Sequence, residues 1–146
     1  MNAMRPEHAV TIEAKVGFQH CDPLGVVWHG RYFEWLEAAR DSLFESRDLG
    51  IPRIRALGHR LYVVDARIRF MVPLTYGDSA RITAWFSAIS PTIRVAYGVH
   101  DVKTGRWCAR AHTVLATTDE QGVLLATTPP RILELLPRVV ESDPEP

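Results

Sequence analysis

The hydrophobic and polar positions of the chain follow two periods, which predict one strand, one long helix and then further strands. Every second residue from Val10 to Phe18 is apolar, so we expect a half-buried strand there. The next apolar residues recur three or four positions apart, which predicts an amphipathic helix from about Gly30 to Asp48. Gly50 is expected to end this helix in the left-handed conformation, and Pro52 to prevent its continuation.

The rest of the chain, from about Leu61, has the pattern of strands separated by short turns, with a last short helix expected from Thr128 to Leu136. The expected strands are residues 66–72, 80–88, 93–99 and 107–115. Short connections between neighbouring strands imply an antiparallel sheet. A single helix with a wide apolar face must be covered by that sheet, so the pattern predicts the α+β class.

Length and composition favour one globular domain. The 146 residues suit a single core, which we expect to span about residues 9–138 of one domain covering 1–146. The acidic, proline-containing end at 141–146 is expected to fray. The formal net charge of +0 leaves no basic stripe for nucleic acid and no polybasic segment for a membrane surface.

The sequence predicts a cytoplasmic protein without metal or other cofactor. The first residues lack the apolar run of a secretory signal, and no window is long enough to span a membrane. The two cysteines, Cys21 and Cys108, have no metal-ligand spacing and are expected to be reduced thiols. The six histidines never take up the paired spacing of a metal site on a helix.

The most informative stretch places one carboxylate, Asp22, in a turn a few residues before the long helix. Such a carboxylate can attack a thioester carbonyl or activate a water molecule. The first free backbone N–H groups of the helix, at His29, Gly30 and Arg31, can polarise the carbonyl oxygen, and one such donor typically lowers the barrier by about 3 kcal/mol. The alternative is that Asp22 only stabilises the turn before Pro23.

The string Cys-Asp-Pro-x-Gly-Val-Val-Trp beginning at Cys21, followed by Tyr32, Trp35 and Phe44, resembles the 4-hydroxybenzoyl-CoA thioesterase family of hotdog-fold acyl-CoA thioesterases. His29 also matches the Val-Val-Tyr-His pattern of related bacterial acyl-CoA thioesterases associated with the cell envelope. The resemblance implies an antiparallel sheet wrapped around one long helix. It also implies a homodimer or homotetramer, with active sites at the subunit interface and no cofactor besides the CoA thioester substrate.

The resemblance makes Asp22 the expected nucleophile or general base. His29 is expected either to orient the substrate and assist proton transfer or to serve only as a helix-start residue. Gly25 and Val27 shape the loop and are counted among the substrate-binding residues. Trp28 is expected to form a wall of the acyl pocket or to pack in the core.

Two further residues are substrate-binding candidates. Tyr32 lies on the apolar stripe of the helix, where core packing is the competing interpretation. Arg94 is a candidate for the phosphates of coenzyme A, although arginines alternating along strands are more often solvated. The stretch 90–92 lacks the basic cluster of the aromatic-CoA enzyme, which favours an acyl carrier protein as the alternative acyl donor.

The sequence therefore predicts an acyl-CoA thioesterase that hydrolyses a short-chain or aromatic acyl-CoA to the free acid and CoA. One alternative is a hotdog thioesterase that releases acyl groups from an acyl carrier protein. The other is a non-catalytic acyl-binding module, but such a protein gains nothing from a carboxylate beside an apolar pocket.

Overall fold

The computed structural model of the chain describes residues 5–140, so the tail expected to fray lies outside the described residues. Two single 3₁₀ turns, η1 (Phe18–His20) and η2 (His29–Arg31), lie between the first strand and the long helix. The strands are β1 (Val10–Lys15), β2 (Arg60–Phe70), β3 (Ser79–Ala88), β4 (Ile93–Asp101) and β5 (Trp107–Thr118). The helices are α1 (Tyr32–Glu45), α2 (Ile51–Ala56) and α3 (Pro130–Leu133).

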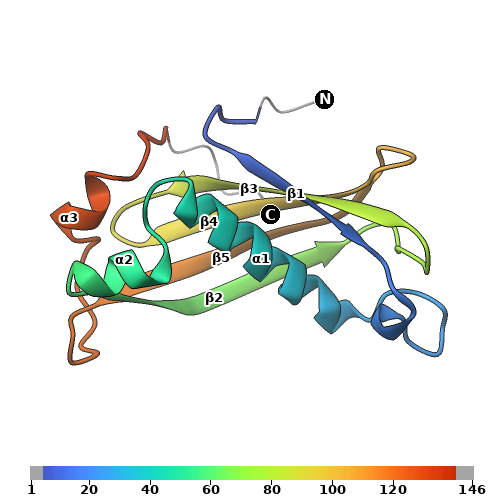
Figure 1. Cartoon of the computed structure of the whole chain (residues 1–146), viewed down its shortest axis with the longest axis horizontal. Helices are drawn as coiled ribbons and strands as arrows, with labels where there is room; N and C mark the ends of the chain where they lie inside the picture. The colour runs from blue at the N-terminus through green and yellow to red at the C-terminus, as the bar shows by residue number, and fades with distance from the viewer. Residues whose placement is uncertain (1–4, 141–146) are drawn as a thin grey trace.

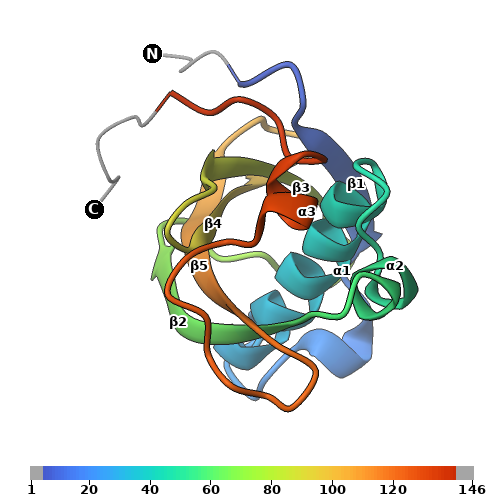
Figure 2. The same cartoon turned by 90° about the vertical axis from the view of Figure 1, so that its left-hand side faces the viewer.

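The five strands form one antiparallel sheet in the order β1-β3-β4-β5-β2. The sheet curves around α1, which crosses its concave face obliquely (Figures 1 and 2). The α+β class, with an antiparallel sheet and one long helix, is therefore confirmed. Strand β2 is an edge strand, because only β5 pairs with it among the described residues.

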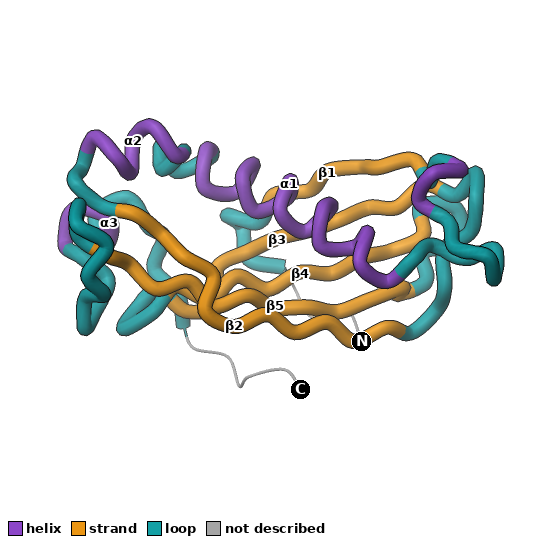
Figure 3. Tube along the Cα trace, turned by 90° about the horizontal axis from the view of Figure 1, so that it is seen from below, coloured by secondary structure: helices purple, strands orange, loops and turns teal. Residues whose placement is uncertain are grey.

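Helix α1 packs mainly on the β1–β3 side of the sheet (Figure 3). Its buried side chains recur at helical spacing, and Leu36, Ala39 and Leu43 are at most 1% exposed. The strands present the matching surface, because alternate residues of β4, namely Ile93, Val95, Tyr97 and Val99, are also at most 1% exposed. The buried stripe of the helix and the alternating residues of the sheet thus form one core.

The end of the long helix differs from the prediction. Helix α1 stops at Glu45, and the left-handed residue is Asp48, with φ of 55°, rather than Gly50. Gly50 is extended, with φ of −60° and ψ of 162°, and precedes a second helix that the pattern did not predict. Pro52 lies in the first turn of α2, where its missing N–H costs nothing, so it begins a helix instead of blocking one.

Two other elements, the first strand and the last helix, are shorter than expected. The first strand ends at Lys15, and Phe18 belongs to η1 with 80% of its surface exposed, so it does not continue the buried face. The last helix is reduced to α3, although Ile132 and Leu136 are still buried as the apolar pattern requires. No helix in the described part of the chain is long and apolar enough to cross a membrane.

We expect Leu43→Ala to lower the free energy of unfolding by about 2–5 kcal/mol, because a fully buried side chain leaves a cavity between α1 and the sheet. Denaturant unfolding at one fixed protein concentration measures this loss. The control is Leu24→Ala, whose side chain is 86% exposed and should cost less than about 0.5 kcal/mol. Equal losses for the two variants would contradict the packing described above.

Candidate functional site

The loop that carries Asp22 is folded by its own backbone hydrogen bonds. The N–H of Asp22 donates to the carbonyl of Val26 at 2.9 Å, and the N–H of Gly25 donates to the carbonyl of Asp22 at 2.9 Å. Gly25 has a φ of 82°, which a glycine adopts without a steric penalty. The loop is a tight hairpin, and Asp22 stands at its base.

The carboxylate of Asp22 takes part in this turn. Its Oδ1 accepts the N–H of Leu24 at 2.8 Å, the contact that aspartate commonly makes with the residue two positions on. The turn-stabilising role considered as the alternative is therefore present. The other oxygen, Oδ2, accepts no hydrogen bond within residues 5–140, so the turn occupies only one of the two carboxylate oxygens.

Two contacts from outside the hairpin hold it in place. The N–H of Val27 donates to the carbonyl of Leu74 at 2.8 Å, which ties the loop to the segment that follows β2. The N–H of Trp28 donates to the carbonyl of His20 at 2.9 Å, and the ring of His20 in turn accepts the N–H of Gly17 at 2.8 Å. The hairpin is thus hydrogen-bonded to η1 on one side and to the segment that follows β2 on the other.

The start of α1 supplies backbone donors next to this loop. The 3₁₀ turn η2 leads directly into α1, and the N–H of Arg31 is already engaged with the carbonyl of Trp28 at 2.9 Å. The N–H groups of His29 and Gly30 donate to no acceptor within residues 5–140. Of the three backbone N–H groups predicted to polarise a carbonyl oxygen, only those of His29 and Gly30 are therefore without an acceptor within residues 5–140. They lie at the N-terminal end of the helix, where the helix dipole is positive.

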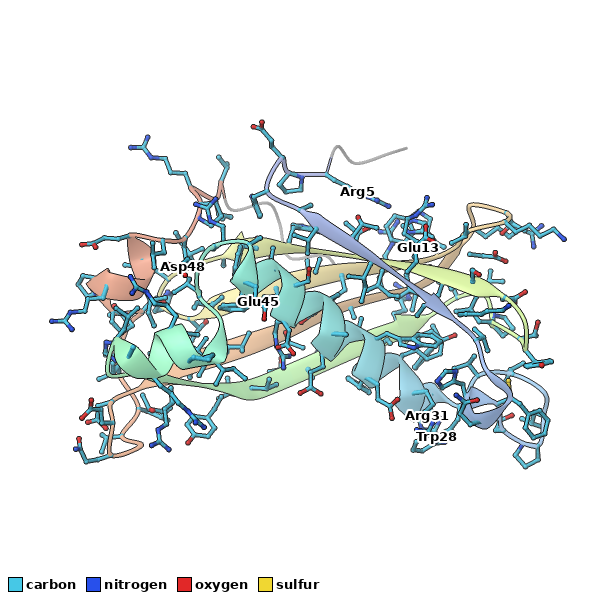
Figure 4. All side chains as sticks on the ribbon, in the orientation of Figure 1. Arg5, Glu13, Trp28, Arg31, Glu45 and Asp48 are labelled. Atoms are coloured by element: carbon cyan, nitrogen blue, oxygen red, sulfur yellow. The ribbon has the colours of Figure 1, made fainter. Side chains whose placement is uncertain are left out.

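Trp28 lies over the backbone of Gly30, on the outside of the helix start. A Cβ atom built on Gly30 would lie 2.3 Å from Cζ3 of the Trp28 ring, so no larger residue fits there while the indole keeps its place. The indole is 48% exposed and neighbours the ring of His29 at 5.1 Å between centroids. Figure 4 shows Trp28 and Arg31 side by side at this end of α1.

A pocket of about 220 Å³ lies between the loop and the helix start. The loop contributes Asp22, Val26 and Val27, and the helix side contributes His29 and Tyr32. The opposite wall is formed by residues 70–73, at the end of β2 and just after it. The ring of Phe70 meets Tyr32 at 5.0 Å and His29 at 6.4 Å between centroids, in both cases edge to face.

Comparison with known proteins places this fold and loop in a family. The family model of the thioesterase-like superfamily matches residues 16–136. The chain belongs to the thioesterase-like superfamily. This membership confirms the expected hotdog fold and the expected enzyme class, a thioester hydrolase.

Among the curated relatives of this superfamily member, a Synechocystis protein named as an esterase is 30% identical over 128 residues, covering 86% of this chain and 76% of its own. YneP of Bacillus subtilis, named as an acyl-CoA thioesterase, is 28% identical over 93 residues, covering 64% of this chain and 67% of its own. The 4-hydroxybenzoyl-CoA thioesterase of a Pseudomonas species is 39% identical over 36 residues, which cover 25% of this chain and 26% of that protein.

Solved structures share the fold. The 1,4-dihydroxy-2-naphthoyl-CoA thioesterase from Synechocystis superposes with a TM-score of 0.75 at 22% identity, covering 86% of this chain and 93% of its own. A variant of 4-hydroxybenzoyl CoA thioesterase, solved with 4-hydroxybenzoyl CoA, has a TM-score of 0.76 at 23% identity, covering 89% of this chain and 99% of its own. At these identities the likeness establishes the fold alone.

The thioesterase-like chain brings four of the predicted site residues to the pocket, namely Asp22, Val27, His29 and Tyr32. Three others lie elsewhere. Gly25 is at the exposed tip of the hairpin, and Trp28 covers the helix start from outside. Arg94 lies on β4 between two buried residues of the concave face, so its side chain is on the opposite face of the sheet.

The pattern of the sequence did not identify residues 70–73 as part of the site. It assigned 66–72 to a strand and ended that strand at Pro73, without relating the segment to Asp22. A proline that stops a strand next to several apolar residues is a weak signal of a pocket wall.

Within residues 5–140, no three histidine, cysteine or acidic side chains gather closely enough to hold a metal ion.

Tyr32, which lines the pocket, has a neutral hydroxyl. Burial raises its pKa to about 12, because the phenolate would lose its hydration on the apolar face of α1. The ordinary pKa of tyrosine is about 10. The hydroxyl therefore remains protonated at any physiological pH and can only act as a neutral hydrogen-bonding group.

This pKa makes a testable contribution to stability at high pH. Folding favours the protonated phenol, so the contribution is fully present below about pH 10 and is lost as the pH rises through about 12. We expect Tyr32→Phe to make unfolding free energy less steeply dependent on pH in this range. Denaturant unfolding at pH 9 to 12 measures it, with Tyr76→Phe, 66% exposed, as the control that should leave the slope unchanged.

Proposed function

We propose that this protein is an acyl-CoA thioesterase that hydrolyses an aromatic or short-chain acyl-CoA to the free acid and CoA. The observation that carries the proposal is the placement of Asp22 and His29 on one pocket at the start of α1, where the N–H groups of His29 and Gly30 have no acceptor within residues 5–140. A carboxylate and backbone donors on either side of one thioester carbon are the groups that hydrolysis requires.

Asp22 acts through the oxygen that the turn leaves free. In one route Oδ2 attacks the thioester carbon, the C–S bond breaks, CoA leaves as the thiol after taking up a proton, and water hydrolyses the resulting mixed anhydride. In the other route Oδ2 takes a proton from water, which attacks the same carbon and releases the acid and the thiol. In both routes the N–H groups of His29 and Gly30 stabilise the charge on the carbonyl oxygen.

His29 is placed to assist the leaving group. Its side chain borders the pocket, and its ring is held by contacts with Trp28 and Phe70. An imidazole nitrogen can donate a proton to a leaving group, so we assign His29 proton transfer to the departing sulfur. Asp22 remains the principal catalytic group.

The size and lining of the pocket support a small acyl group. A volume of about 220 Å³ is below the roughly 300–1,000 Å³ of sites for drug-sized ligands, which favours a small acyl group over a long fatty acyl tail. The edges and faces of Tyr32 and Phe70 favour an aromatic ring. The solved relatives named for dihydroxynaphthoyl-CoA and 4-hydroxybenzoyl CoA point to the same class of acyl group.

The active form is proposed to be a homodimer or homotetramer. Strand β2 is an edge strand with a row of exposed apolar side chains, among them Tyr62, Val63, Val64 and Phe70, each 45–54% exposed. An uncovered strand of this kind is a template for pairing with another strand. Pairing of β2 with β2 of a second copy would cover this row and enclose the pocket wall at Phe70.

We expect Asp22→Asn to lower turnover of benzoyl-CoA by two orders of magnitude or more, because an amide can neither attack the carbon nor accept the proton. The amide oxygen can still accept the N–H of Leu24, so the fold should persist. Release of free thiol measures the rate. Asp101→Asn is the matched control, since Oδ1 of Asp101 accepts the N–H of Lys103 at 2.9 Å in the same kind of turn.

Near-normal turnover of the Asp22 variant would end the assignment. The same assay with butyryl-CoA and with benzoyl groups on an acyl carrier protein separates the acyl and carrier preferences. Turnover of the carrier-linked form alone would replace CoA by a carrier protein as the donor. Tight binding of the thioester without thiol release by the unmodified protein would indicate a binding module instead.

We expect Val64→Lys to weaken self-association by tenfold or more, because Val64 lies near the middle of the exposed edge strand β2 and a lysine covered by a second copy would lose its hydration. Sedimentation velocity over a dilution series measures association, and specific activity should fall with it. The control is Val123→Lys, 59% exposed in the turn after β5. An unchanged oligomer in the Val64 variant would rule out pairing through β2.

A further inference from the structure

A second and larger cavity, of about 620 Å³, lies beyond the C-terminal end of α1, away from the Asp22 pocket. Its walls come from the N-terminal segment 6–8, the end of β3 at 85–87, Arg47, and the segment 137–140 after α3. The two terminal segments approach the same side of the sheet in Figures 1 and 2. Its volume falls within the range of about 300–1,000 Å³ found for small-molecule sites.

The cavity exists because β1 does not cover the end of β3. The pairing of β1 with β3 begins at Val10 and Ala84, so Trp85 and the following residues have no partner on β1. His8 takes the place of the missing strand, and its Nε2 accepts the N–H of Phe86 at 3.0 Å. A ring nitrogen that accepts is unprotonated, so the neutral ring of His8 carries its proton on Nδ1.

Two arginines add positive charge to this cavity. The Nε of Arg47 donates to the carbonyl of Leu135 at 2.8 Å, which holds the guanidinium beside the segment after α3. Burial lowers the pKa of His8, and the charge of Arg47 lowers it further. The guanidinium of Arg47 therefore lies close enough to His8 for their charges to interact. Neither Arg47 nor Arg138 forms an ion pair with a carboxylate within residues 5–140.

The remaining lining determines what the positive charge can bind. Glu7 is the one acidic residue lining the cavity, and it is exposed, so the balance of fixed charge is positive. Pro6, Pro137 and Val139 form apolar walls. A guanidinium pairs best with a planar carboxylate, and an apolar wall favours a hydrocarbon body rather than a hydrated ion.

We infer that this cavity is a second binding site, for a small organic carboxylate with an apolar body. The guanidinium groups of Arg47 and Arg138 and the Nδ1–H of His8 hold the carboxylate, and the proline and valine walls hold the hydrocarbon part. This site is separate from Asp22 and does not depend on the thioesterase chemistry. It adds a ligand-binding site at the far end of α1.

The test titrates octanoate into the full-length protein by calorimetry. We expect one carboxylate per chain, with Arg47→Gln weakening binding by about tenfold or more because a charged hydrogen bond is lost. Arg138→Gln tests the same point without touching a structural contact, since Arg138 is exposed, and should weaken binding by about threefold or more. Arg53→Gln, which removes an equal charge from α2, should leave binding unchanged.

Three further measurements locate the site. Asp22→Asn should bind octanoate as the unmodified protein does, and the backbone amides of Phe86 and Ser87 should shift in ¹⁵N spectra while those of the Asp22 loop do not. Inorganic phosphate, which has charge without an apolar body, should bind far more weakly. Equal binding of phosphate, no effect of either arginine variant, or shifts confined to the Asp22 loop would each overturn the inference.

Discussion

The pocket depends on the backbone hydrogen bond from Val27 to Leu74, which joins two parts of the chain almost fifty residues apart. This bond, at 2.8 Å, holds the Asp22 hairpin next to the segment that follows β2. Leu74 and Val27 are both buried, so an unpaired N–H or carbonyl there would be costly. The carboxylate is therefore positioned by the segment that follows β2 as well as by the bonds of its own hairpin, and residues 70–73 form the opposite wall of the pocket.

Helix α1 is too narrow to cover the whole sheet, and this leaves parts of both sheet edges uncovered. Helix α1 covers the β1–β3 side and leaves β2 with exposed apolar side chains. At the other edge β1 is shorter than β3, so the end of β3 is covered only by His8 and the terminal segments. The uncovered strand β2 is the one that we propose to pair with a second copy of the chain, and the uncovered end of β3 borders the larger cavity.

Local patterns were sufficient for the long helix, for the order of the strands and for the residues next to Asp22 in sequence, but not for α2 or for the exact element ends. Helical spacing identified the buried stripe of α1, and the turn and helix start placed Asp22, His29 and Tyr32 together. Contacts between distant segments were beyond such patterns, which is why residues 70–73 were not recognised as a wall. The side of the sheet on which Arg94 lies depends on which face α1 covers, and the alternation alone does not decide it.

The errors at the helix ends have a common physical cause. Glycine and proline were interpreted as terminators of α1 at Gly50 and Pro52, but each residue also fits the first turn of a helix. Leu49 and Ile54 account for the difference, because both are buried in the same core as α1 and the second helix brings Ile54 into that core. Asp48 adopts the left-handed conformation instead, which aspartate tolerates better than most residues.

The position of the Trp28 indole on Gly30 has an optical consequence. The ring lies against the position that a Cβ atom on Gly30 would occupy, and about half of its surface meets solvent. A larger residue at position 30 would therefore have to displace the indole. The emission of Trp28, one of four tryptophans in the chain, would then change with its new surroundings, so fluorescence can report a substitution at Gly30.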